Sequence, residues 1–172
     1  MSFNLEQSIE ILQATPTTLS ALLGDLSDDW LHLNEGTDTW SAFDIVGHLI
    51  HGEETDWIPR IKMILAQNDT PFEPFDRFAQ LEKSKGKSIQ DLLTRFQYLR
   101  TENLDTLRKL NLSESDLSLP GIHPELGQVT LKNLLATWTS HDLSHISQIG
   151  RVMAKRFKNE VGPWHQYMKI LH

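Results

Sequence analysis

Three histidines of this chain have a spacing that suits a metal site. His141 and His145 are four residues apart in the segment Ser-His-Asp-Leu-Ser-His-Ile, and His48 precedes them in a separate segment. If the later segment is helical, its two imidazoles lie one turn apart on one face, with about 6 Å between their Cβ atoms, so they can share one ion. Neutral imidazole is the commonest protein ligand of zinc-like metals. A third histidine from a neighbouring helix would complete a site that keeps a fourth position open for water or substrate.

The competing interpretation is that these histidines are ordinary core residues. The pair continues an apolar stripe along its predicted helix, and His48 lies in the apolar segment Ile-Val-Gly-His-Leu-Ile. A lone histidine on such a face is more often a core residue hydrogen-bonded to a carbonyl or carboxylate. Two buried imidazoles one turn apart each need a polar partner, and His48 is a third in apolar surroundings. Gly47 beside it would let another backbone or a ligand come close.

The other histidines are not expected to bind the metal. His51 follows His48 by three residues and lies on a neighbouring sector of the same predicted helix. It is a candidate for proton transfer beside the site rather than a ligand. The remaining ones are expected in loops or at the surface: His32, His123, His165 and His172.

The chain contains no cysteine. Disulfides and thiolate metal sites are therefore excluded, and any metal must be held by histidine, aspartate or glutamate. A sulfur nucleophile would have to enter as a substrate.

Other site chemistries are poorly supported. A di-iron carboxylate bundle needs Glu-x-x-His on two helices, and the nearest approach is one Asp142-x-x-His145. The His-Glu-x-x-His motif of metalloproteases is absent, as are a glycine-rich phosphate loop and a Gly-x-Ser-x-Gly segment.

Composition restricts the class of protein further. A chain of 172 residues with 39% hydrophobic and 23% charged residues is expected to form one globular domain, residues 1–172. The net charge of −7 argues against a nucleic-acid-binding surface, which needs a basic patch. Neither a signal peptide nor a membrane span is recognisable, so we expect a cytoplasmic protein without membrane partners.

Hydrophobic periodicity predicts an all-α fold with four long helices. Ser41 is expected to cap the second, with Asp44 as its capping-box partner. Pro16 is expected to kink the first helix or to follow a short first piece that ends near Ala14, and Pro59 is expected to kink the second helix. The predicted helices cover residues 5–31, 41–66, 88–110 and 130–157.

Two long connectors separate these helices. Residues 67–87 exceed the length of about 2–8 residues that usually joins adjacent antiparallel helices. Such a crossover allows the third helix to run parallel to the second. The second connector covers residues 111–129, and the tail from residue 161 could add an amphipathic turn.

These features together resemble the DinB-like superfamily of bacterial four-helix proteins, which includes YfiT-like metal-dependent hydrolases. The resemblance rests on Trp40-Ser41 followed by Ile45-Val-Gly-His48-Leu, on the long crossover, and on His141-x-x-x-His145-x-x-Gln148. It implies an up-down-down-up bundle with one divalent metal on His48, His141 and His145. Zinc or nickel is usual in such proteins.

The resemblance also implies an activity. Characterised relatives are transferases or isomerases that use a low-molecular-weight thiol, so we expect a homodimeric enzyme that transfers a small thiol to an electrophilic substrate. Its candidates for proton transfer or for support of the ligands are His51, Asp142 and Gln148. The alternatives are a hydrolase that uses water activated by the metal, and a non-catalytic, metal-binding stress-response bundle.

Overall fold

Long helices dominate the fold, and short elements connect them. The computed structural model describes residues 2–67 and 69–172, so residues 1 and 68, which fall in the predicted domain and first connector, lie outside the described residues. The helices are α1 (Leu5–Leu23), α2 (Asp28–Leu31), α3 (Ala42–Thr55), α4 (Trp57–Leu65), α5 (Ala79–Lys83), α6 (Ile89–Lys109) and α7 (Leu131–Ala154), and the strands are β1 (Pro120–His123) and β2 (Gly127–Thr130). Short 3₁₀ helices cover Asp116–Ser118, Lys155–Phe157, Gly162–Tyr167 and Lys169–Leu171.

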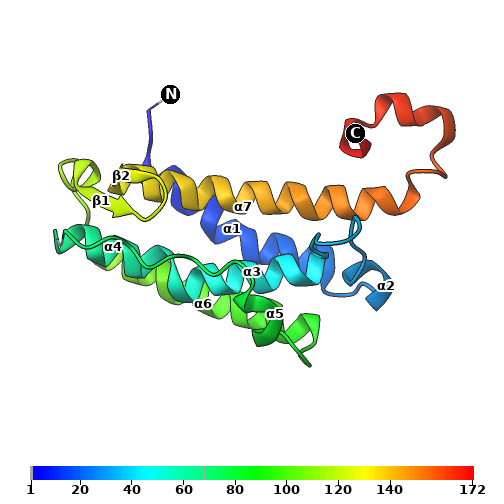
Figure 1. Ribbon diagram of the computed structural model, residues 1–172, viewed down its shortest axis with the longest axis horizontal. Coiled ribbons are helices and arrows are strands. Elements are labelled where there is room, and N and C mark those ends of the chain that lie inside the picture. The colour runs from blue at the N-terminus through cyan, green and yellow to red at the C-terminus, as the bar shows by residue number, and fades with distance from the viewer. Residues whose placement is uncertain (1, 68) are drawn as a thin grey trace.

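The bundle has the predicted up-down-down-up topology. Figure 1 shows α1 and α7 running in one direction, and α3–α4 and α6 running in the other. The crossover after α4 returns along the length of the bundle, so α6 starts at the same end as α3 (Figure 1). Helix α1 packs on α6 and α7, and α3 also packs on both of these helices. The pairing of α3 with α7 is the one that matters for the histidines.

Capping boxes define where three of the long helices begin. The Ser41 hydroxyl accepts the amide N–H of Asp44, and the Asp44 carboxylate accepts the amide N–H of Ser41, which confirms the predicted cap of α3. The same reciprocal arrangement starts α6 at Ser88 and α7 at Thr130. Each cap stabilises its helix by about 1 kcal/mol, so the starts of α3 and α7 are well defined.

The first two predicted helices are divided differently from the prediction. Pro16 lies inside an uninterrupted α1, which ends at Leu23, and α2 is a separate short helix. Proline leaves the carbonyl four residues earlier without its helical donor. Here the buried Arg100 donates to that carbonyl, at Leu12, over 2.7 Å. Before Pro59, no described side chain donates to the Thr55 carbonyl, and α3 ends at Thr55, four residues before this proline.

Both connectors contain structure that the sequence did not predict. The first includes α5, whose C-terminal Ser84 lies against Gly47; a Cβ at Gly47 would come within 2.5 Å of the Ser84 hydroxyl. The expectation that Gly47 permits a close approach is therefore confirmed. The second connector contains the antiparallel pair β1–β2, with Gly121 opposite Val129. This hairpin binds the first connector through Phe72, whose amide donates to the Ile122 carbonyl.

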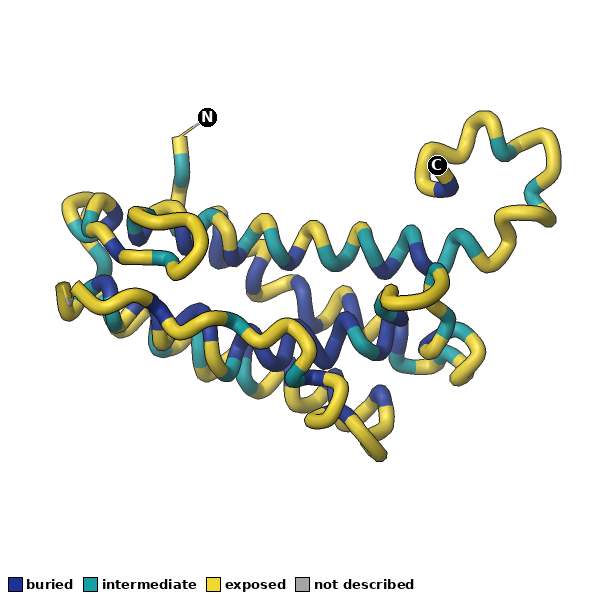
Figure 2. Tube along the Cα trace, in the orientation of Figure 1, coloured by how far each residue is buried: buried dark blue, intermediate teal, exposed yellow. Residues whose placement is uncertain are grey.

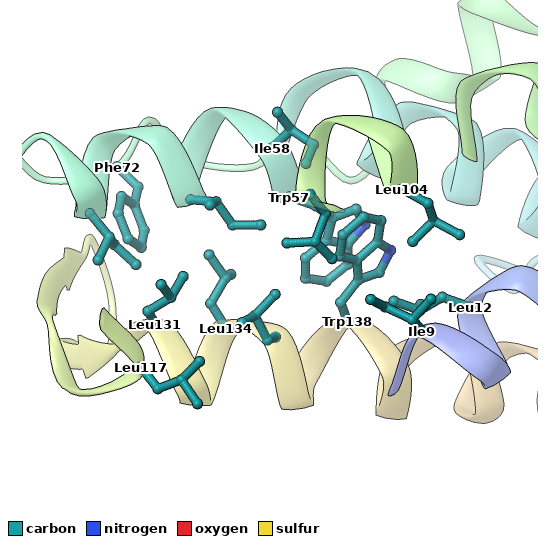
Figure 3. Packing of buried hydrophobic residues seen from close by; sticks show 14 residues of the cluster. Ile9, Leu12, Trp57, Ile58, Phe72, Leu104, Leu117, Leu131, Leu134 and Trp138 are labelled. Atoms are coloured by element: carbon teal, nitrogen blue, oxygen red, sulfur yellow. The ribbon is translucent and has the colours of Figure 1, made fainter. Parts of the chain in front are cut away.

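The core lies along the inner faces of the long helices. Buried positions line the sides of the helices that face one another, whereas the first connector and the C-terminal segment are mostly exposed (Figure 2). Figure 3 shows Trp57 of α4 and Trp138 of α7 stacked at the centre of one core cluster, with ring centroids 5.6 Å apart. Within the described residues no helix is both long and apolar enough to span a membrane.

Candidate metal centre

The three predicted ligand histidines converge on one point between α3 and α7. His141 Nε2 lies 3.1 Å from His48 Nε2 and 3.1 Å from His145 Nε2. One nitrogen from each ring lies within 4.8 Å of the others. Because α3 and α7 are in contact, a histidine on α3 reaches the pair that one turn of α7 places on a single face.

This arrangement fits a metal ion better than a network of hydrogen bonds. A neutral imidazole nitrogen offers either one N–H or one lone pair, so His141 Nε2 cannot bond well with two neighbouring nitrogens at once. The buried Nδ1 atoms of His48 and His141 have no hydrogen-bond partner among the described residues. In a tetrahedral zinc site, with bonds of about 2.0–2.1 Å, two ligand nitrogens are about 3.3 Å apart, close to the spacing found here.

Burial keeps the three imidazoles in the neutral form that binds metals. The pKa of His48 is lowered from 6.5 to about 3, chiefly by burial and then by the nearby charges of His145, His51 and Arg77. Burial is also the main cause that lowers the pKa of His141 to about 3. The pKa of His145 is lowered by burial as well. Near neutral pH, each ring therefore has a lone pair available for a cation.

Gln148 orients one of these rings. Its side-chain oxygen lies 2.8 Å from His145 Nδ1, so Nδ1 carries the proton and Nε2 presents its lone pair to His48 and His141. Such support is typical of metal-binding histidines, whose second nitrogen usually donates to an oxygen. Trp40 packs on His48, with ring centroids 4.7 Å apart, and stacks on His145, with ring centroids 6.4 Å apart.

His51 lies beside the cluster but is not part of it. Its Nδ1 is 3.2 Å from Lys83 Nζ, which also forms an ion pair with Glu54. Phe75 of the first connector contacts the rings of both His51 and His48. His51 therefore connects α3 to the connector that covers the cluster, and its expected part in proton transfer remains a prediction.

Asp142 forms a buried ion pair with Arg100. Both of its carboxylate oxygens accept hydrogen bonds from Arg100, over 2.6 and 3.0 Å. Arg100 also donates to Glu53, which accepts a further hydrogen bond from the Trp138 indole. These charged side chains are almost completely buried. The described contacts thus place Asp142 in a network that joins α3, α6 and α7, and its expected part in the chemistry remains a prediction.

The histidine cluster separates an inner cavity from an outer one. The inner cavity has a volume of about 270 Å³, and most of its surface is apolar, with Trp57, Phe72 and Leu134 among the residues that line it. The outer cavity, of about 510 Å³, is more polar and includes Arg77 and Arg151 in its lining. His48, His141 and Phe75 line both cavities. A ligand could therefore reach the cluster from either side.

Sequence reasoning missed the polar residues of the inner cavity. His123 was expected in a loop but ends β1 and lines this cavity, because the hairpin folds over the end of α4. Asp56 and Arg60, which pair over 2.6 Å, line it as well. Their spacing of four residues near the predicted kink was the available signal. Of the other histidines, His32 packs on Phe43. His165 and His172 contact each other in the C-terminal tail.

Comparisons with known proteins identify the fold and the family. The structure of YfiT from Bacillus subtilis, described as "a probable metal-dependent hydrolase with an unusual four-helix bundle topology", is similar, with a TM-score of 0.78 and 22% sequence identity. The similarity covers 90% of each chain. No functionally curated protein matches the sequence. The family model of the DinB superfamily matches residues 11–149, and the chain therefore belongs to the DinB superfamily.

Proposed function

We propose that this protein is a metal-dependent enzyme that transfers a low-molecular-weight thiol to an electrophilic substrate. The proposal rests on the position of the histidine cluster, in which His48 and His141 line two cavities of different character and His145 lines the outer one. Two cavities that meet at one centre would allow two substrates to approach it from different sides. The polar outer cavity suits the thiol compound, and the apolar inner cavity suits the electrophile.

The side chains around the centre have separable tasks in this proposal. A divalent metal, with zinc or nickel as the expected ions, would supply Lewis-acid chemistry that lowers the pKa of a thiol or a water molecule that it binds. His48, His141 and His145 would hold it through their Nε2 atoms, and Gln148 keeps His145 in the required tautomer. His51 is our candidate for accepting the proton that the thiol releases.

Hydrolysis is the second candidate function. It is supported by the fold similarity to YfiT, and the same open metal position would activate water. The absence of cysteine from the chain is compatible with both reactions, since thiol transfer takes its sulfur from a substrate. The two candidates differ in whether turnover requires an added thiol.

A panel of reactions separates these functions. We expect the metal-loaded protein to accelerate attack of small thiols on electrophiles, and we expect the chelated protein not to do so. Turnover should be followed with several thiols and electrophiles, beside ester and amide substrates without thiol. Thiol-independent ester or amide turnover would favour hydrolysis instead. No turnover in any of these reactions, with metal firmly bound, would favour the non-catalytic metal-binding bundle.

Two variants link the panel to the site. His51→Ala should lower turnover without loss of metal, because His51 contacts Phe75 and Lys83 but lies outside the cluster. His32→Ala, at an exposed position beside Phe43, is the matched control and should leave turnover unchanged. Full activity of His51→Ala would show that His51 does not accept the proton that the thiol releases.

We also propose that the protein is a homodimer. The C-terminal segment projects from the end of α7 (Figure 1) and exposes Trp164 and Tyr167 at 66% and 74%. Exposed aromatic surface of this kind is typical of interfaces. Light scattering at micromolar concentration should give about twice the 19.8 kDa of one chain, and Trp164→Ser should weaken the association. A mass of one chain would contradict the dimer.

A further inference from the structure

The inner cavity is built like a binding site for a small molecule with an apolar body. Figure 3 shows Phe72, Trp57 and Leu134 between α4 and α7, and all three line this cavity. Its volume of about 270 Å³ is near the lower end of the range of about 300–1,000 Å³ for ligand pockets. A few polar groups that converge in such a cavity usually fix the orientation of the ligand, and these groups identify its chemical class.

Arg60 presents an unused donor to this cavity. Its Nε lies 2.6 Å from the Asp56 carboxylate, and its Nη2 donates to the Glu73 carbonyl over 3.3 Å. The guanidinium lies over the Phe72 ring, 5.1 Å from the ring centre. Among the described residues, Nη1 has no hydrogen-bond partner. Arg60 is therefore held in place by three contacts while one end of its planar fork remains available.

His123 presents a second donor near the first. Its Nδ1 accepts the backbone N–H groups of Glu125 and Leu126, over 3.1 and 3.2 Å. The ring proton must therefore be on Nε2, for which the described part of the chain supplies no acceptor. Burial, and then the charge of Arg60, lower the pKa of His123. The neutral imidazole thus offers one N–H, and its ring faces the same Phe72 that lies under Arg60.

These two donors call for a ligand group that only accepts hydrogen bonds. A carboxylate has two oxygens and no donor, so it can take both N–H groups, and a charge-assisted bond to arginine is roughly twice as strong as a neutral one. A primary amide would satisfy them less well, because its NH₂ group cannot accept. Asp56 already balances the charge of Arg60, so the discrimination comes from directed hydrogen bonds rather than from net charge.

We propose that the inner cavity binds a small carboxylic acid with an apolar body, its carboxylate at Arg60 and His123 and its body directed towards His48 and His141. The inference rests on the proposed function for the statement that this acid is the electrophilic substrate. The binding site itself depends only on the cavity and its two donors. The substrate class, which the family resemblance leaves open, would then be a small carboxylic acid with an apolar body.

Matched probes test the proposal on the full-length, metal-loaded protein. Isothermal titration calorimetry should show 3-phenylpropionate binding at least about tenfold more tightly than the isosteric 3-phenylpropanamide. Arg60→Gln should reduce the affinity for the acid to that for the amide, and His123→Phe should lower it several-fold. Arg77→Gln, which changes the outer cavity, is the matched control and should leave the affinity unchanged. The preference for the acid should persist after chelation of the metal.

Other outcomes would contradict a carboxylate site in the inner cavity. Equal affinities for the two probes, or no binding of either at millimolar concentration, would contradict a carboxylate site. An affinity that disappears on chelation but is indifferent to Arg60→Gln and His123→Phe would show that the acid binds the metal instead. If Arg60→Gln does not fold, His123→Phe decides the matter, because the hydrogen bonds of His123 are confined to the turn of the hairpin. Metal content measured on the same samples keeps failure of the metal centre distinct from failure of this site.

Discussion

Replacement of His141 or His145 by alanine should lower the affinity for a divalent metal by more than about 100-fold. Loss of a group that merely supports a ligand typically costs about 10–100-fold in metal affinity, and these variants remove a ligand itself. His48→Ala should have a severe effect as well, because its Nε2 is one of the three that converge. Titration of the chelated protein with zinc or nickel, followed by calorimetry, measures these affinities.

Graded controls sharpen this expectation. Gln148→Leu removes only the partner of His145 Nδ1. This variant should lower the metal affinity by about 10–100-fold. His32→Ala and His172→Ala should bind metal as the unaltered protein does. An equal loss of metal affinity in all of these variants would refute the site. So would the absence of metal binding when the three histidines are intact.

Replacement of Arg100 by methionine should cause the largest loss of stability of any single change outside the metal centre. It would leave Glu53 and Asp142, both fully enclosed, without their cation. Breaking a buried ion pair in this way costs about 3–5 kcal/mol. For a chain of this size, such a change lowers the midpoint of thermal unfolding by on the order of 10 °C.

The matched control for Arg100 is Arg95, on the same helix. Arg95 pairs with Glu54, and their side chains are 46% and 25% exposed, so Arg95→Met should cost no more than about 1 kcal/mol. Circular dichroism on heating compares the two variants. Similar midpoints for both would show that the buried network contributes little.

The sequence was sufficient to predict which three histidines come together, because their signal is local. The helical spacing of His141 and His145, and the capping residues Ser41 and Thr130, are set by neighbouring residues along the chain. The same holds for the four long apolar stripes, and the length of the first connector indicated its crossover. The topology of the bundle followed from these features together with the family resemblance.

The features that sequence reasoning missed depend on contacts between distant segments. Pro16 remains inside α1 because Arg100, from α6, supplies the donor that the Leu12 carbonyl would otherwise lack. The place of His123 in the inner cavity depends on how the hairpin folds over α4. The partner of Asp142 is Arg100, which is 42 residues away in the sequence. No local pattern identifies such partners.

Three imidazole nitrogens are expected to bind one divalent metal at an open site. X-ray absorption spectroscopy of the full-length protein, purified without an affinity tag, measures this coordination. We expect one metal per chain with three histidine nitrogens at about 2.0–2.1 Å for zinc, together with one exchangeable ligand. A metal bound mainly by carboxylate or water oxygens, or by four protein ligands with no exchangeable position, would contradict it.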